Sequence, residues 1–188
     1  MEKLSKLFEM KDEVIKMLNF PETRQATSWT CGDSAVQTVL EYYGIDDHEM
    51  DLAGFLGSTE TNGTSILKMI KFLNMNGLQT DCKEMMNVND LIHYINKDIP
   101  IIMMIQAWGD KTDYTKEWGD GHYTVAIGYT KDKILFSEPS LYTTGYIGYR
   151  ELMTRWHDED ENKRYVRFGC AVYGKSIKFN KEEITHIG

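Results

Sequence analysis

The sequence predicts an α+β domain whose first half is mainly helical and whose second half is an antiparallel sheet. Before Pro100, apolar residues recur at spacings of three and four, as on the buried face of a helix. After Pro100 the chain changes to short β-prone runs bounded by Gly, Asp or Lys. We therefore predict a single domain over residues 1–188, in which residues 21–98 are mainly helical and residues 99–188 form the sheet.

The first 20 residues predict an amphipathic N-terminal helix that covers the domain. Its apolar positions recur at helical spacing over about residues 3–19, and Pro21 ends the pattern. Charged residues interrupt this stretch at every turn, so it lacks the uninterrupted apolar core of a signal peptide. Because no later run approaches the length of a membrane span, we expect a cytoplasmic protein without such a span.

A buried helix is predicted to begin at Cys31, because apolar residues follow it at helical spacing as far as Gly44, a signal for a helix C-terminus. The charge run His157–Glu161 is typical of a solvated loop. Turn, capping and β-branched residues predict the other elements. They are helices between Thr64 and Gly77, over Val88–Asn96 and over Tyr149–Trp156, and strands over Ile101–Ile105, Tyr123–Tyr129, Ile134–Phe136 and Gly169–Tyr173.

The charge balance makes nucleic acid a poor candidate partner. Acidic residues number 29 and basic residues 21, giving a formal net charge of −8. No stretch clusters Lys or Arg with aromatic residues to the extent that a surface that follows phosphates requires. A metal site is not predicted either, because the histidines outside the motifs below lack an H-E-x-x-H partner or paired cysteines. These histidines are His48, His93, His157 and His186.

The three cysteines, Cys31, Cys82 and Cys170, are an odd number at wide spacing without a C-x-x-C pair. This pattern argues against a disulfide framework and a zinc site, and it predicts at least one free thiol. A thiol in the first turn of a helix lies among unpaired backbone N–H groups, which favour the nucleophilic thiolate. Only Cys31 has that position. A lone cysteine is more often a small buried apolar residue, so position alone leaves both interpretations open.

Three polar residues can complete a catalytic site around Cys31. Gln25 lies six residues upstream, in the loop that leads to Cys31, where its amide can donate to an oxyanion. His122 stands at the start of a predicted strand, where an imidazole is accessible as a base. If that strand pairs with the next through a hairpin at residues 131–133, Glu138 lies near the same end and can orient the imidazole.

Aromatic and glycine residues next to these positions are candidates for lining a substrate cleft. Trp29 precedes Cys31 by two residues, and Gly121 directly precedes His122. The alternative for such an aromatic residue is that it covers the core. The polar segment 108–120, which contains Trp108 and Trp118, predicts an ordinary loop, with a mobile lid as the alternative.

The order of these motifs resembles C39 and C39-like cysteine peptidases. The opening of that family is similar to Gln25-x5-Cys31-Gly32 followed by a helix that ends at Tyr42-Tyr43-Gly44. The resemblance covers roughly residues 25–173. It continues through Gly63-Thr64-Ser65, Gly77-Leu78, Pro100, Gly121-His122-Tyr123, Ile127-Gly128-Tyr129 and Glu138-Pro139.

The resemblance implies a papain-like fold and an enzyme that hydrolyses a peptide or amide bond without a cofactor. It assigns Cys31 as nucleophile, His122 as base, Glu138 as the orienting acid and Gln25 to the oxyanion hole. The family usually carries Asp at the position of Glu138. Peptidases of bacteriocin exporters usually have Asp where this chain has Thr30, and they are fused to a transporter. Cleavage of double-glycine leaders is therefore one substrate assignment among others.

Two other functions fit the same residues. One is an acyl or peptidyl transferase, because phytochelatin synthases also place a Cys-Gly pair at a helix start. The other is a catalytically inactive module that binds a peptide in the cleft, which the departure at Glu138 favours. In each case the partner is a peptide or a small amide, while the sequence leaves the substrate and the oligomeric state open.

Overall fold

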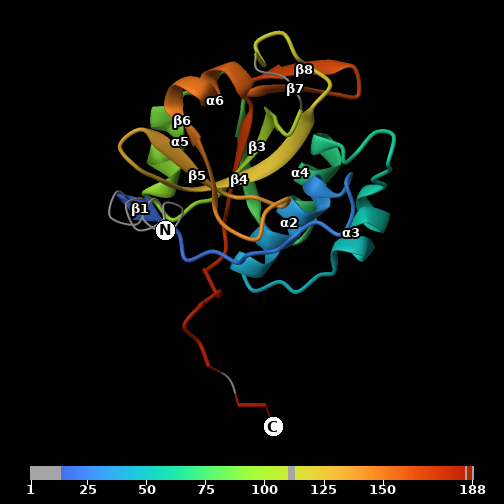
Figure 1. The fold of residues 1–188 in the computed structure, drawn as a ribbon. Coiled ribbons are helices and arrows are strands. Elements are labelled where there is room, and N and C mark those ends of the chain that lie inside the picture. The colour runs from blue at the N-terminus through green and yellow to red at the C-terminus, as the bar shows by residue number, and fades with distance from the viewer. Residues whose placement is uncertain (1–13, 110–112, 185, 188) are drawn as a thin grey trace, which may run out of the picture.

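A seven-stranded antiparallel sheet forms the centre of the fold (Figure 1). The computed structural model describes residues 14–109, 113–184 and 186–187. The strands follow the order β2-β9-β3-β4-β5-β6, with β1 beside one end of β4. Their bounds are β1 Lys16–Met17, β2 Gln79–Lys83, β3 Ile101–Gln106, β4 Gly121–Tyr129, β5 Lys133–Ser137, β6 Gly145–Gly148 and β9 Gly169–Tyr173.

Strand β4 lies in the interior of this sheet because its sequence is apolar or β-branched on both faces. All its residues from His122 to Tyr129 are buried, as expected of a strand covered on two sides. Strand β3 pairs with β4 as far as Ala126, and β5 pairs with its other edge through a bulge between Ala126 and Gly128. The predicted hairpin at residues 131–133 therefore joins β4 to β5.

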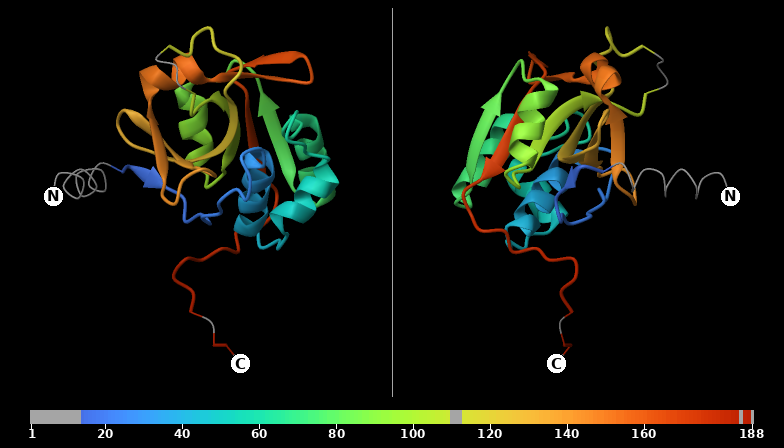
Figure 2. Two further views of the ribbon diagram at one scale, coloured as in Figure 1. Left: turned by 45° about the vertical axis from the view of Figure 1, so that its right-hand side comes forward. Right: turned by 90° about the vertical axis from the view of Figure 1, so that its left-hand side faces the viewer.

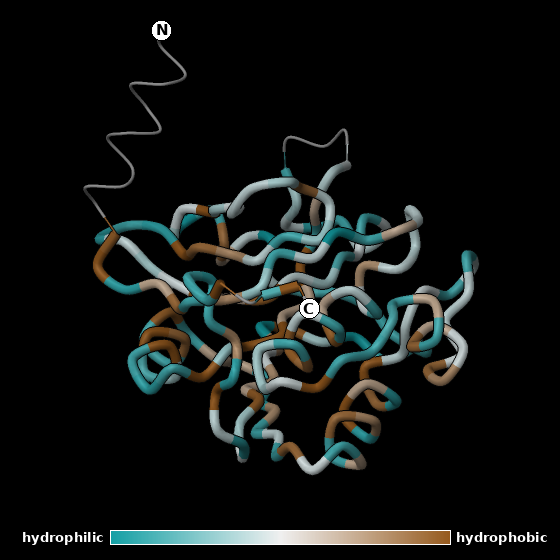
Figure 3. The backbone as a smooth tube through the Cα atoms, turned by 90° about the horizontal axis from the view of Figure 1, so that it is seen from below, coloured by the Kyte–Doolittle hydropathy of each residue, from teal (hydrophilic) through white to brown (hydrophobic). Residues whose placement is uncertain are grey.

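Five helices pack around the sheet in the described part of the chain, and α2 is the most deeply buried. Only Cys31, Gln37 and Glu41 of α2 are partly exposed, which is typical of a helix in the core. Helices α2, α3 and α4 lie together beside the sheet (Figure 1). Hydrophobic positions recur along the coiled segments of the backbone (Figure 3). The helices are α2 Cys31–Tyr42, α3 Glu49–Leu56, α4 Ile66–Met75, α5 Val88–Ile95 and α6 Tyr149–Arg155.

The chain leaves the sheet after β9 and passes the C-terminal end of α2. The backbone N–H groups of Lys178 and Phe179 donate to the carbonyl of Tyr42 at 3.1 and 3.3 Å. The segment that follows leads away from the domain (Figure 2). Within the described ranges, none of the helices has the length and apolar character needed to cross a bilayer.

The prediction of an N-terminal helix is wrong for the part of it that the structure describes. Lys16 and Met17 form strand β1, and residues 1–13 lie outside the described residues. The backbone of Ile15 donates to Tyr129 at 3.1 Å, and that of Leu18 donates to Ile127 at 2.8 Å. Because β3 ends its pairing before this point, the open edge of β4 binds the segment as an extra strand.

The charge run at residues 157–161 is a hairpin and not the predicted solvated loop. Strand β7 (His157–Asp160) pairs with β8 (Lys163–Val166), and its first two residues are buried. The two residues between the strands, Glu161 and Asn162, have φ of 48° and 66°. Positive φ at both central positions is typical of a type I′ hairpin turn, for which a glutamate is an unusual residue.

A disulfide joins Cys82 on β2 to Cys170 on β9, contrary to the expectation from cysteine number and spacing. The two residues are directly opposite each other in the β2–β9 register, although 88 positions separate them in the sequence. Spacing could not reveal this contact, because only the strand order brings the two cysteines together. Cys31 is free, as the odd number of cysteines predicts.

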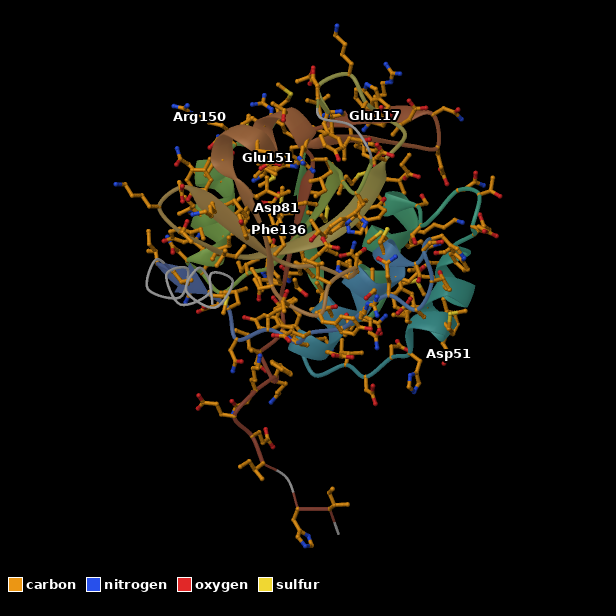
Figure 4. The ribbon with its side chains drawn as sticks, in the orientation of Figure 1. Asp51, Asp81, Glu117, Phe136, Arg150 and Glu151 are labelled. Carbon is orange, nitrogen blue, oxygen red and sulfur yellow. A yellow bond between two sulfur atoms is a disulfide. The ribbon has the colours of Figure 1, made fainter. Side chains whose placement is uncertain are left out.

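We expect the fold to depend on the aromatic core residue Phe136 of β5, which lies near the middle of the molecule (Figure 4) and is only 2% exposed. Phe136→Ala should lower the free energy of unfolding by about 3–5 kcal/mol, because it removes buried contacts and leaves a cavity. Urea denaturation measures this change. The matched control is Tyr146→Ala on the adjacent strand, whose side chain is 53% exposed. This variant should change the free energy of unfolding by no more than about 0.5 kcal/mol. Equal losses in the two variants would contradict the assigned core.

Candidate active site

Cys31 is the first residue of α2, and the preceding turn leaves the helix N-terminus open. The N-cap residue is Thr30, whose hydroxyl donates to the carbonyl of Thr27 at 3.3 Å and accepts from its N–H at 3.1 Å. No side chain caps the helix within the described part of the chain. The Cys31 side chain is therefore placed beside first-turn N–H groups and the positive end of the helix dipole.

The first turn of α2 is fixed to the segment between α3 and α4 by the buried carboxylate of Asp33. Ser58 and Thr64 donate to its two oxygens at 2.7 and 3.2 Å. Burial raises the pKa of Asp33, and these hydroxyls oppose the rise. At Gly32, a Cβ would lie 2.6 Å from the Cβ of Thr64. The close approach of this segment to Cys31 thus requires glycine after the cysteine.

His122 and Glu138 form a buried pair at the place where β4 begins and β5 ends. Nε2 of His122 donates to Oε1 of Glu138 at 2.7 Å, and each side chain is 7% exposed. The backbone N–H of Ser140 donates to the same oxygen at 2.9 Å. This contact matches the prediction from the hairpin register. Because Nε2 is occupied, Nδ1 is the ring nitrogen left for a second partner.

The charges of the site favour a protonated His122. Burial by itself lowers the pKa of His122, but interactions with Cys31 and Glu138 outweigh it and raise the pKa to about 10. Burial likewise raises the pKa of Glu138, and the opposing contacts from His122 and Ser140 bring it below its usual value. Cys31 and Glu138 therefore both interact with His122, and both favour its protonated imidazole.

Gln25 is anchored to the turn that follows Glu138. Its backbone N–H donates to the carbonyl of Pro139 at 3.0 Å, and its Oε1 accepts from the hydroxyl of Ser140 at 3.1 Å. One N–H of its carboxamide donates to the carbonyl of Thr27 at 2.7 Å. The hydrogen bonds of Gln25 within the described ranges do not include Cys31. This loop glutamine nevertheless joins the turn before the nucleophile to the turn after the acid.

The candidate cleft residues line two different pockets. Trp29, Trp118 and Gly121 line one of about 330 Å³, and Trp108 lines another of about 200 Å³ that includes Glu138. The ring of Trp108 meets that of His122 edge to face, with ring centres 6.4 Å apart.

The sequence did not point to two residues of the larger pocket. These residues are Asp158 and Tyr123. Asp158 belongs to the charge run that was predicted to be a solvated loop, and Tyr123 was predicted only as part of a strand. Residues 157–160 are all polar, so they lack the apolar and polar alternation that would have marked a strand containing Asp158. For Tyr123, no pattern in the sequence separates a pocket residue from a core residue.

The model of the family described as Peptidase_C39 like matches residues 17–173. The chain belongs to this family. The match includes Cys31, His122 and Glu138, and it confirms the resemblance on which those positions were assigned. No curated protein sequence matches the chain significantly.

Solved structures of C39 peptidase domains share the fold. The peptidase domain of Streptococcus ComA, a bifunctional ABC transporter involved in a quorum-sensing pathway, has a TM-score of 0.60 and 15% identity, covering 85% of this chain and 98% of that one. A double-glycine-motif protease from an AMS/PCAT transporter, in complex with its leader peptide, has a TM-score of 0.59 and 14% identity, covering 86% and 96%. A Bacillus anthracis protein described as a C39-like peptidase has a TM-score of 0.63 and 14% identity, covering 87% and 98%. The α+β papain-like fold is thereby confirmed.

We expect the imidazole of His122 to remain protonated well above the ordinary histidine pKa of about 6.5. Glu138→Gln should lower the pH at which it titrates, because the variant removes the negative charge that favours the imidazolium. The carbon and nitrogen chemical shifts of the ring measure this titration.

The matched control is Glu151→Gln, which removes a carboxylate paired with Arg155 at 2.7 Å rather than with His122. It should leave the titration of His122 unchanged. A midpoint near the ordinary value in the unmodified protein, or equal shifts in both variants, would contradict the assigned interaction.

Proposed function

We propose that the protein is a cysteine peptidase or amide hydrolase in which Cys31 is the nucleophile, His122 the base and Glu138 the orienting acid. The observation that carries the proposal is the convergence of these three side chains at an uncapped helix N-terminus. A cation beside the sulfur and the helix dipole both favour the thiolate, which is the nucleophilic form. Membership in the C39-like family supports the same assignment.

The proposed reaction begins when the Cys31 thiolate attacks the carbonyl carbon of a peptide or amide. The negative charge moves to the carbonyl oxygen, which accepts from the backbone N–H of Cys31 and from the second N–H of the Gln25 carboxamide. His122 then protonates the leaving amine through Nδ1, and the C–N bond breaks to leave a thioester. Water, deprotonated by His122, attacks the thioester and releases the acid and the thiolate.

Glu138 acts in this mechanism through the imidazole and not on the substrate. Its bond to Nε2 fixes the ring so that Nδ1 faces the reacting sulfur, and its charge stabilises the imidazolium. The longer side chain, relative to the usual Asp, reaches His122 at hydrogen-bond distance. The departure from the family pattern at this position therefore does not by itself favour an inactive binding module.

The proposed substrate is a peptide held in the cleft between the start of α2 and the start of β4. This proposal is supported by the similarity to a protease whose structure contains a leader peptide. An amine or thiol that replaced water in the last step would make the enzyme a transferase. Mass spectrometry of products formed with and without an added amine or thiol distinguishes transfer from hydrolysis.

We expect iodoacetamide to label Cys31 selectively in the native protein over about pH 5–7, well below the free thiol pKa of ~8.5. His122→Ala should abolish this reactivity at low pH, because it removes the cation beside the sulfur. Mass spectrometry locates and quantifies the label. Reactivity that is indifferent to His122 would contradict the proposed pair and favour a binding module.

Gln25→Ala should lower kcat by about 10²- to 10³-fold, the usual effect of removing one oxyanion donor. The same variant should leave iodoacetamide labelling of Cys31 unchanged, because alkylation forms no oxyanion. Cleavage of a fluorescence-quenched peptide library measures kcat for the pool. Ser140→Ala serves as the control for anchoring, since it removes a bond to Gln25 but keeps the donor. A Gln25 variant with unchanged cleavage would exclude this residue from the oxyanion hole.

A further inference from the structure

The pocket of about 330 Å³ beside the candidate triad has the composition of a recognition site. It reaches from Trp29, two residues before the nucleophile, to Gly121, directly before His122. The hairpin β7–β8 (Figure 1) and the loop that carries Glu117 (Figure 4) lie at the same edge of the molecule. Both contribute to the pocket, through Asp158–Asp160 and through Trp118 and Gly119. Its charged lining residues are all carboxylates: Glu60, Asp158, Glu159 and Asp160.

Three of these carboxylates need no ligand, because each is either exposed to solvent or already paired. Glu60 is exposed at the rim. Glu159 pairs with Arg164 at 3.0 Å, and Asp160 accepts from the backbone N–H of Ile66 at 2.9 Å, where α4 begins. Asp158 is the buried carboxylate that remains, and no Lys or Arg of the described chain pairs with it.

Asp158 is held in a fixed position with one oxygen left for a ligand. Its Oδ1 accepts from Nε2 of Gln106 at 3.0 Å and from the backbone N–H of Glu159 at 2.8 Å. Gln106 is itself fixed, because its Oε1 accepts from the N–H of Asp120 at 2.9 Å. Oδ2 receives no hydrogen bond from the part of the chain that the structure describes. A Cβ at Gly121 would lie 2.6 Å from Oδ2 of Asp158. Any larger residue at position 121 would therefore clash with the carboxylate.

The hydroxyl of Tyr123 is a second group without a partner in the same pocket. Tyr123 lines the pocket and is only 6% exposed, yet its Oη forms no hydrogen bond with the described residues. Burial raises the pKa of this hydroxyl, as do the nearby charges of Asp160 and Asp158. Buried hydroxyls without a partner are rare because each one costs the energy of its lost hydration. A buried hydroxyl without a partner, beside a carboxylate with one free oxygen, indicates a ligand that donates hydrogen bonds to both groups.

We propose that this pocket, which we call the acidic subsite, binds the cationic side chain of a lysine or arginine in the peptide substrate. Asp158 is the counterion, and the Tyr123 hydroxyl accepts a hydrogen bond from the same ammonium or guanidinium group. Such a group donates several hydrogen bonds and accepts none, so two free acceptors match it. The face of Trp29 adds an aromatic surface to which a cation is attracted. The proposal rests on the proposed function only in that a peptide occupies the cleft.

The test measures binding to the Cys31→Ala variant, so that turnover is not required. Fluorescein-labelled octapeptide pools carry Lys, norleucine or Glu at one fixed position and mixtures elsewhere, and fluorescence polarisation gives the affinity of each pool. Norleucine is the matched control because it keeps the length of the lysine stem without the charge. At one position, Lys should bind at least about tenfold more tightly than norleucine, and Glu should bind more weakly still.

Substitutions in the pocket decide whether the acidic subsite is responsible. In the Cys31→Ala background, Asp158→Asn should abolish the preference for Lys, while its side-chain oxygen can still accept from Gln106. Tyr123→Phe should reduce the preference without loss of folding, since it removes a hydroxyl that bonds to nothing. Glu159→Gln, a carboxylate already paired with Arg164, should leave the preference intact.

The outcomes separate this proposal from the proposed function. A Lys preference that is absent at every position, or that survives Asp158→Asn, would overturn the acidic subsite. That result would leave the labelling of Cys31 and its dependence on His122 unchanged. Conversely, unreactive Cys31 together with an Asp158-dependent Lys preference would support the subsite and reject the hydrolase.

Discussion

The buried pair between His122 and Glu138 is the interaction on which the rest of the site depends. Breaking such a pair by removing one member leaves an uncompensated charge and typically costs about 3–5 kcal/mol. The pair exists only because β4 and β5 are held in one register, and that register brings the imidazole to the open end of α2. The chemistry of the thiol is thus coupled to the correct assembly of the sheet.

Much of this arrangement could be predicted from the sequence, because the signals involved are local. The helix that begins at Cys31 is marked by its apolar spacing and by Gly44. The hairpin around residues 131–133 is marked by charged residues between two apolar runs, and it places His122 and Glu138 at one end. The family resemblance then assigned roles to positions that spacing alone could only bring near each other. Those catalytic roles, the single-domain boundaries and the cytoplasmic location stay predictions.

The features that the sequence did not predict correctly depend on contacts between distant segments. The segment that contains β1 has the apolar spacing of a helix, but its backbone pairs with an open edge of β4 and forms a strand. The disulfide follows from the order of β2 and β9, which cysteine spacing does not encode. Asp158 was predicted to lie in a solvated run because its neighbours in the sequence are charged. Its burial depends on contacts with distant residues such as Gln106, which the local sequence does not encode. In each case tertiary partners overrode a local preference.

The proposed nucleophile and its proposed base come from distant parts of the chain, with Cys31 on α2 and His122 on β4. During synthesis, which proceeds from the N-terminus, α2 leaves the ribosome long before β4 and β5 can pair. A nascent or truncated chain that ends before residue 121 therefore carries an ordinary thiol without its imidazole and carboxylate. Under the proposed mechanism, the thiol becomes reactive only after β4 and β5 have paired, so the order of biosynthesis would keep Cys31 unreactive while the chain is still growing.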